Sequence, residues 1–270
     1  MRRIAHLSDL HFGRLAVDRV DALRVDLARN AINLIVISGD LTQRARHTEF
    51  EAARKFIREF GVPVVAVPGN HDIPAYNLFE RFVAPNRRYN RYIAPYARDT
   101  YIDEELAVAA VDTAVRARFS FDWSGGRIRR KVAGAVTRWV VKKAQGRSVV
   151  VVAHHVLKSF SGSTTLGDRL RNDALVTLAR SGVDLVLGGH HHRAEARIFP
   201  DQGNAPGLVV SHAATATSSR HREEDNSYNL IDVAKDTMTW SVRSFADGAF
   251  CLTKRLCFEK AYMSGWRIAP

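Results

Sequence analysis

The chain of 270 residues has only two cysteines, Cys251 and Cys257, and no apolar run that could span a bilayer. Two cysteines near one end form no disulfide framework, so we expect both thiols to be reduced and buried. A membrane-spanning helix needs about 20 apolar residues, so none is predicted. The first predicted strand begins at Arg3, which leaves no room for a signal peptide, and a cytoplasmic location is expected.

Acidic residues are the scarcer charge, with 28 Asp and Glu against 40 Lys and Arg, and the formal net charge is +12. This excess favours anionic partners, which include nucleotides, nucleic acid and acidic lipid headgroups, and does not choose among them. Internal repeats and low-complexity segments are absent. A chain with 46% hydrophobic and 25% charged residues can bury a full core, so residues 1–270 are predicted to form a single domain.

Runs of apolar, mostly β-branched residues predict buried strands. They lie at 4–7, 34–37, 62–67, 106–111, 149–152 and 183–187. Helical spacing of apolar residues predicts helices at about 17–27, 50–60, 133–143 and 173–180. Thr48 and Glu51 are expected to form a capping box at the start of the second helix. Strands that alternate with helices predict a central sheet with helices packed on it.

Two regions depart from this alternation. From residue 208 onward the pattern predicts strands without a helix (208–210, 228–233 and 237–245), so we expect a second sheet packed on the first. Residues 73–100 are rich in arginine and tyrosine and are interrupted by prolines, which indicates a cap-like insert. Its segment 76–98 could stack on a base or bind a diphosphate; a folded cap or a dimer contact is an equally good interpretation.

Other polar segments are assigned to loops. A hairpin is expected around Gly125 and Gly126, and the basic cluster at 127–131 is expected to be a solvated loop. The Ser-, Thr- and Gly-rich segment 158–167 is expected to be a mobile loop.

Short polar motifs directly follow the predicted strands. They are Asp9-Leu10-His11, Gly39-Asp40, Gly69-Asn70-His71-Asp72, His154 and Gly189-His190-His191-His192. An α/β fold gathers such strand ends at one edge. In Asp9-x-His11 and His190-x-His192 the two side chains are expected on one side of an extended segment. Carboxylate, imidazole and carboxamide groups together suit divalent transition metals such as Mn, Fe, Zn or Co.

In order and residue type these motifs resemble those of the calcineurin-like metallophosphoesterase family, over residues 9–192. The HLSD-x-H opening and the GDLT segment are similar in style to bacterial class III cyclic nucleotide phosphodiesterases. The resemblance implies an α/β fold, a four-layer α/β/β/α sandwich of two mixed sheets with flanking helices. It also implies two divalent metal ions. One would be held by Asp9, His11, Asp40 and His192, and the other by Asp40, Asn70, His154 and His190.

The same resemblance implies a binuclear phosphodiesterase in which a hydroxide held between the ions attacks phosphorus. His71 is then the general acid for the leaving group, and Asn70 also binds substrate. A cyclic nucleotide, a nucleoside-diphosphate sugar lipid, a nucleic acid and a phosphomonoester all stay open as the anionic substrate. A partner-binding protein without catalysis is disfavoured, because such chains usually lose several of these positions and this chain keeps them all.

One segment departs from a related pattern. Residues 39–44 resemble the G-D-x-x-D-R form of protein phosphatases, but Gln43 replaces the carboxylate that would orient the catalytic histidine. Arg44 is either a phosphate clamp or a member of a surface salt bridge. Asp72 either orients His71 or ends the turn. His155 and His191 are expected outside the ligand set.

Overall fold

The computed structural model describes residues 1–114, 130–156, 166–200, 205–219, 224–261 and 264–270. The hairpin expected at Gly125 and Gly126 and most of the loop expected at 158–167 lie outside these residues. The same holds for residues 127–129 of the basic cluster and for the side chains of its last two residues.

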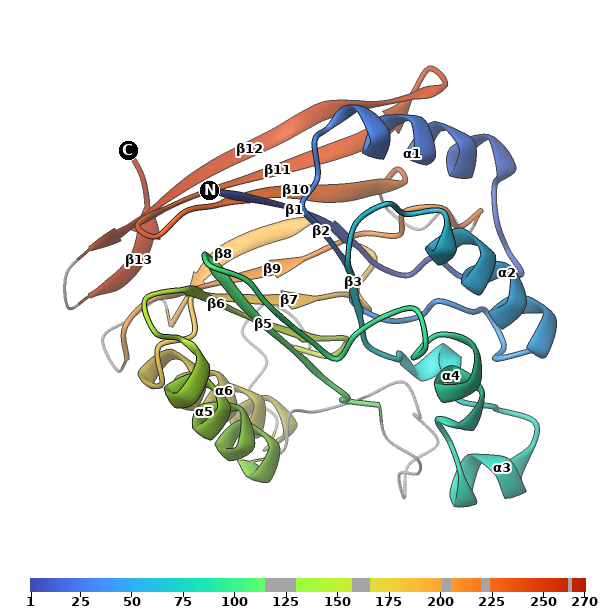
Figure 1. Ribbon diagram of the computed structural model, residues 1–270, viewed down its shortest axis with the longest axis horizontal. Helices are drawn as coiled ribbons and strands as arrows, with labels where there is room; N and C mark the ends of the chain where they lie inside the picture. Colours follow the sequence, from blue (N-terminus) through green and yellow to red (C-terminus); the bar gives the residue numbers. More distant parts are fainter. Residues whose placement is uncertain (115–129, 157–165, 201–204, 220–223, 262–263) are drawn as a thin grey trace.

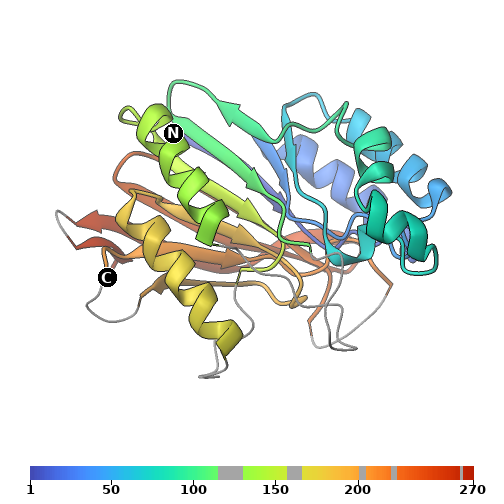
Figure 2. The same ribbon diagram turned by 90° about the horizontal axis from the view of Figure 1, so that it is seen from below.

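Two mixed sheets pack face to face, and helices cover the outer face of each (Figures 1 and 2). The seven-stranded sheet has the order β13 (Gly265–Ile268), β12 (Ala249–Ala261), β11 (Thr237–Ala246), β10 (Ser227–Val233), β1 (Arg2–Leu7), β2 (Leu34–Ile37) and β3 (Val64–Ala66). The six-stranded sheet has the order β4 (Thr100–Ile102), β5 (Leu106–Val111), β6 (Ser148–Ala153), β7 (Leu185–Gly188), β9 (Leu208–His212) and β8 (Glu195–Phe199). The predicted four-layer sandwich is confirmed.

Alternation along the strands builds three apolar layers. Leu34 and Val36 of β2 face the six-stranded sheet, whereas Ile35 and Ile37 face helices on the other side. Those helices are α1 (Val17–Arg29) and α2 (His47–Arg58), on the outside of the seven-stranded sheet. Helices α5 (Arg130–Lys143) and α6 (Leu166–Arg180) cover the six-stranded sheet in the same way (Figure 2).

The strand directions bring the motifs together. Strands β1, β2 and β3 are parallel to one another, as are β5, β6, β7 and β9 in the other sheet. All the predicted ligand motifs follow carboxyl ends of these parallel strands. The hydrogen bonds described below show that both sets of ends open on the same side of the sandwich.

The expectation that the strands from residue 208 onward form the second sheet is wrong in part. The C-terminal strands β10 to β13 extend the first sheet, because β10 pairs antiparallel with β1, and only β9 joins the other sheet. Periodicity identifies a strand but not its neighbour, since pairing depends on contacts between distant parts of the chain.

Two local expectations are also corrected. Helix α2 begins at His47, so Thr48 lies inside it, and the Glu49 carboxylate accepts hydrogen bonds from the backbone N–H of Arg46 and Arg44 (3.2 and 2.8 Å). Cys251 and Cys257 are free, as expected, but both are exposed rather than buried. No described helix combines the length and apolar character that a membrane span requires.

The segment at 73–100 forms two short helices beside α2 (Figure 1). After a 3₁₀ turn, η1 (Asn70–Asp72), come α3 (Leu78–Val83) and α4 (Arg87–Tyr92). The Arg88 guanidinium on α4 donates to the Ala45 carbonyl (2.7 Å), and the Tyr92 ring stacks on Phe50 of α2. These contacts place α4 against the loop that precedes α2 and carries Arg44.

Candidate active site

All eight residues predicted for the metals and the acid lie around one site where the two sheets meet. The backbone there is linked across the sheets: the Ser38 carbonyl after β2 is 2.7 Å from the ring Nδ1 of His154 after β6. The Asp9 carboxylate after β1 likewise accepts from the backbone N–H of His190 after β7 (3.0 Å).

One group of side chains consists of Asp9, His11 and His192, all buried. Asp9 Oδ1 lies 3.1 Å from His192 Nε2 and 3.7 Å from His11 Nε2, and the two Nε2 atoms are 3.4 Å apart. The second Asp9 oxygen is occupied, because Oδ2 accepts from the Ser8 hydroxyl (2.6 Å) and from His190 N–H. Oδ1 has no hydrogen-bond partner in the described part of the chain and is therefore available as a ligand atom.

A second group joins Asp9 to Asp40 and His154. His154 Nε2 is 3.3 Å from Asp40 Oδ2. The His154 Nδ1–H donates to the Ser38 carbonyl, which fixes the ring and directs Nε2 toward the carboxylates. The other Asp40 oxygen, Oδ1, accepts from His71 N–H (2.8 Å). Asp40 thus lies between the two halves of the predicted site.

The third group contains one residue that the sequence interpretation left outside the set. His154, His155 and His190 place three ring nitrogens within 4.8 Å of one another. The His155 ring lies 4.5 Å from that of His190, and His155 Nε2 is 3.1 Å from the Asn70 carboxamide oxygen. Strict alternation after β6 would turn His155 away, but the chain leaves the strand geometry there. No motif in the sequence marks its contact with Asn70.

The backbone at the site is unusual. Five of the seven predicted metal ligands have left-handed backbone, with φ between 50° and 75°: Asp9, His11, Asp40, His190 and His192. The expected extended geometry of the two i, i+2 pairs is therefore wrong. The side chains of Asp9 and His11 still converge, whereas His190 and His192 belong to different groups. Non-glycine residues rarely adopt this conformation, and such strain is concentrated at functional sites.

His71 is held by a backbone group. Its ring Nδ1 is 2.8 Å from the carbonyl oxygen of Gln43, and the ring packs edge-on against His11 at 4.9 Å. A carbonyl only accepts, so Nδ1 carries the proton of this hydrogen bond and Nε2 is left for a reacting group. The Gln43 side chain is not the contact, so the missing carboxylate is replaced by the main chain.

The contacts of Asp72 and Arg44 bear on the alternatives that the sequence left open for them. The Asp72 carboxylate accepts from the backbone N–H groups of Gly69, Leu41 and Thr42 at 2.8–3.1 Å, so it ties two loops together and does not touch the His71 ring. Arg44 is exposed, and its guanidinium makes no ion pair with any residue that the structure describes. The salt-bridge alternative for Arg44 is therefore not supported.

Electrostatics at the site favour anionic carboxylates at Asp9 and Asp40 and neutral imidazoles at His11 and His190. Burial alone would raise the pKa of Asp9 and Asp40, but the surrounding histidines outweigh it and hold both pKa values well below normal. Burial lowers the pKa of His11 and of His190 to about 4, so both rings are neutral near pH 7. At His154 burial is opposed by Asp40, which raises the pKa to about 9.

These features suit a binding site for divalent cations. Buried polar atoms converge without hydrogen-bond partners, including Asp9 Oδ1 and His154 Nε2. The neutral rings of His11 and His190 beside ionised carboxylates suit metal binding. The donors are nitrogen and oxygen in a mixture suited to Mn, Fe, Zn or Co.

Comparisons with known proteins agree with this chemistry. The profile of the calcineurin-like phosphoesterase family matches residues 2–194. A protein of Synechococcus sp., named a probable cyclic nucleotide phosphodiesterase, is 26% identical over 206 residues, which cover 71% of this chain and 73% of that protein.

Solved structures share the fold at low identity. Purple acid phosphatase PPD1 from yellow lupin (Lupinus luteus) superposes with a TM-score of 0.65 at 13% identity, over 97% of this chain and 54% of that chain, so this chain spans about half of the lupin enzyme. A dimetal phosphatase from Danio rerio gives 0.62 at 12% identity, over 93% and 98% of the two chains. Because the family profile covers well over half of the sequence, the chain belongs to the calcineurin-like phosphoesterase family, the metal-dependent hydrolases of phosphate esters.

Proposed function

We propose that the protein is a phosphodiesterase with two divalent metal ions and that His71 is its general acid. Asp9, His11, Asp40 and His192 hold one ion in this proposal. Asp40, Asn70, His154 and His190 hold the other. The observation that carries the proposal is the convergence of buried oxygen and nitrogen atoms on both sides of Asp40. Hydrogen bonds to the second polar atom hold the Asp9 and Asp40 carboxylates and the His154 ring in place.

In this proposal the residues around the site have separate roles. When bound, a pair of divalent ions supplies an activated water and neutralises charge on the phosphoryl oxygens. Ser8 and Ser38 orient Asp9 and His154 for this. The Gln43 carbonyl accepts from His71 Nδ1–H and orients the ring, so that in this proposal Nε2–H protonates the departing oxygen.

Several observations support a nucleotide-like diester as substrate. The Synechococcus relative is named a cyclic nucleotide phosphodiesterase, and the net charge of +12 favours an anionic substrate. Exposed Arg44 directly follows Gln43, whose carbonyl contacts the His71 ring, and is proposed to bind a phosphate oxygen. Cys251 and Cys257 are exposed free thiols, which supports a reducing, cytoplasmic location for this single-domain enzyme.

The central experiment measures hydrolysis of bis(p-nitrophenyl) phosphate by the wild-type chain with added Mn²⁺, with EDTA as the control. We expect turnover that EDTA abolishes, and less turnover of p-nitrophenyl phosphate than of the diester. Asp40→Ala should lose bound metal, measured by mass spectrometry after dialysis. A manganese-loaded protein that hydrolyses no phosphate diester would contradict the proposal.

The role of His71 is tested by its variant and by the leaving group. His71→Ala should lower kcat about 10²- to 10⁴-fold for a diester with an alkoxide leaving group, with metal content unchanged. The loss should be smaller for p-nitrophenolate, which leaves without protonation. His47→Ala, an exposed histidine on α2, is the matched control and should keep full activity. Equal losses with both leaving groups would refute the acid role.

A further inference from the structure

Helix α3 turns its apolar side chains to solvent and its charged side chains toward the protein. A surface helix normally has the opposite arrangement. The exposed fractions lie between 51% and 81% for five side chains of the helix and the residues just before it, which we call the α3 face: Tyr76, Leu78, Phe79, Phe82 and Val83.

The charged residues of α3 make their contacts inside the molecule. The Arg88 guanidinium of α4 donates to the Glu80 carboxylate (3.0 Å), which is 11% exposed. Arg81 is 3% exposed, and its guanidinium donates to the Pro74 carbonyl (3.3 Å). These contacts hold the charged side of α3 against the protein, so its apolar side chains are left on the outside.

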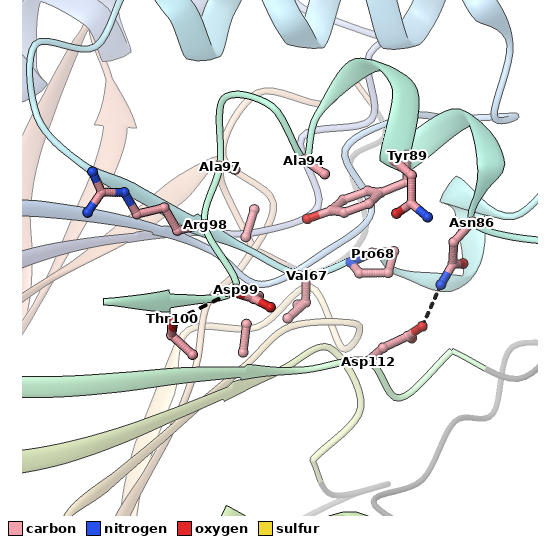
Figure 3. A pocket seen from close by; sticks show the side chains of 13 residues that line it. Val67, Pro68, Asn86, Tyr89, Ala94, Ala97, Arg98, Asp99, Thr100 and Asp112 are labelled. Atoms are coloured by element: carbon pink, nitrogen blue, oxygen red, sulfur yellow. Dashed lines mark hydrogen bonds between the residues drawn. The ribbon is translucent and has the colours of Figure 1, made fainter. Parts of the chain in front are cut away.

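Helix α4 attaches the two short helices to the sandwich. The carboxamide of Asn86, the residue before α4, donates to the Asp112 carboxylate after β5 (2.7 Å) (Figure 3). The buried Tyr89 ring extends from α4 into a pocket that Pro68 also lines (Figure 3). The inner side of this unit is therefore anchored, and the α3 face is exposed to solvent.

The segment that carries the α3 face is basic. Residues 76–98 contain five arginines and one acidic residue, the Glu80 of the ion pair above. Arg87 and Arg91 of α4 are exposed. The Arg87 backbone N–H donates to the Ala84 carbonyl (3.0 Å) in the turn between the helices, which keeps the start of α4 beside the end of α3. Exposed apolar groups and positive charge thus occur together.

The size and charge of this surface distinguish between possible occupants. A second copy of the chain would bring the same arginines together, and like charges repel. A stable protein interface has about 20–30 residues on each side, whereas the α3 face has five. Projecting apolar side chains with cations beside them fit a fluid bilayer that has anionic headgroups.

We propose that the α3 face docks the protein on the surface of a bilayer that contains anionic phospholipids. Phe79 and Phe82 enter the boundary between headgroups and acyl chains, and Arg87 and Arg91 bind lipid phosphates. This inference does not depend on the proposed phosphodiesterase function.

The first test measures binding of the whole chain to vesicles of phosphatidylglycerol and phosphatidylcholine in equal parts, by sedimentation. EDTA is present so that no lipid phosphate binds through a metal ion. We expect binding that weakens as NaCl is raised, and much weaker binding to phosphatidylcholine alone. Phe79→Ser should weaken binding to the anionic vesicles about tenfold or more, because an apolar ring no longer enters the bilayer.

Matched variants separate the α3 face from exposed side chains elsewhere. Leu78 and Leu252 are equally exposed, at 53%, but Leu252 lies on β12, across the molecule from α3 (Figure 1). Leu78→Ser should weaken vesicle binding about tenfold, and Leu252→Ser should leave it unchanged. Arg87→Gln should weaken it about fivefold, and Arg255→Gln on β12 should not. Because all four side chains are exposed, the melting temperatures should stay near that of wild type.

Several outcomes would overturn the proposal. Wild type that binds no anionic vesicles would do so, as would vesicle binding that Phe79→Ser and Leu78→Ser leave intact. Equal binding to neutral and anionic vesicles would contradict the role of the arginines. Analytical ultracentrifugation tests the second copy: a dimer that Phe79→Ser dissociates, in a chain that binds no vesicles, would assign the α3 face to self-association instead.

Discussion

Individual residues of this site are held in conformations that are costly by themselves. Left-handed backbone at a non-glycine residue costs about 1–3 kcal/mol, and Asp9, Asp40 and His192 are among five proposed ligands that adopt it. Hydrogen bonds such as His11 N–H to the Asp40 carbonyl (3.0 Å) and Asp9 N–H to the Gly39 carbonyl (3.0 Å) compensate part of this cost. These hydrogen bonds hold the backbone of the proposed ligands Asp9 and His11 in place.

A buried histidine behind the site makes stability depend on pH. His6 Nε2 is 2.8 Å from Ser38 Oγ, its Nδ1 is 3.4 Å from Asn229 Nδ2, and burial lowers its pKa to about 3. The unfolded chain, with a histidine pKa near 6.5, binds more protons than the native state over this range, so stability is full above pH 6.5 and falls as pH falls toward 3.

We therefore expect wild type to lose about 2 kcal/mol of unfolding free energy between pH 7 and pH 5 relative to His6→Gln. Urea unfolding in EDTA at several pH values measures this. His47→Gln, which removes an exposed histidine, should keep the wild-type slope. Superimposable pH profiles of wild type and His6→Gln would show that His6 does not carry the effect.

At the scale of elements, the loops after β1, β2, β3 and β7 pack so closely that a side chain at Gly69 or Gly189 would clash with a neighbouring loop. A Cβ at Gly189 would lie 1.9 Å from Ser8 Oγ and 2.8 Å from Asp9 Oδ2. A Cβ at Gly69 would lie 2.1 Å from Asp40 Oδ1. These glycines allow the loops of the two sheets to approach closely enough for one set of ligands.

Gly189→Ala should therefore displace Asp9 and lower manganese affinity at least tenfold, measured by calorimetry, and should lower the melting temperature of the protein. Gly134→Ala is the matched control, because Gly134 lies in α5 with its nearest neighbour at 3.8 Å. That change should leave metal affinity unaltered and stabilise the helix by up to about 1 kcal/mol. Unchanged metal affinity in Gly189→Ala would contradict this account of the loop.

For the whole molecule, the site joins the two sheets. Asp9, Asp40 and Asn70 follow strands of the seven-stranded sheet, whereas His154 and His190 follow strands of the six-stranded sheet. Two buried carboxylates at this junction repel each other unless a cation lies between them, so metal binding should stabilise the packing of the sheets.

Removal of metal should consequently lower the thermal stability of the whole domain. At a Mn²⁺ concentration 100-fold above its Kd, binding adds about 2.7 kcal/mol to the unfolding free energy, a rise of a few degrees in Tm for a domain of this size. Calorimetric scans with EDTA and with Mn²⁺ measure this shift. Asp40→Ala should show no such rise, and a rise that survives this change would place the stabilising metal elsewhere.

The sequence by itself determined the strands, their ends and the chemical types of the ligands. Apolar runs such as 34–37 and 106–111 matched β2 and β5 residue for residue, because a strand buried on both faces has no polar interruption. Polar residues directly after such runs have few roles other than a site at the strand ends. Asp9, Asp40, Asn70 and the histidines could therefore be predicted as candidate site residues before the fold was known.

Only the tertiary structure decided which strands are neighbours and what each polar atom touches. The pairing of β10 with β1 joins segments that are distant in sequence, as do the contact of His155 with Asn70 and the hydrogen bond between His71 and the Gln43 carbonyl. Local patterns carry no information about such contacts, because burial, loop approach and backbone strain arise only when the whole chain packs.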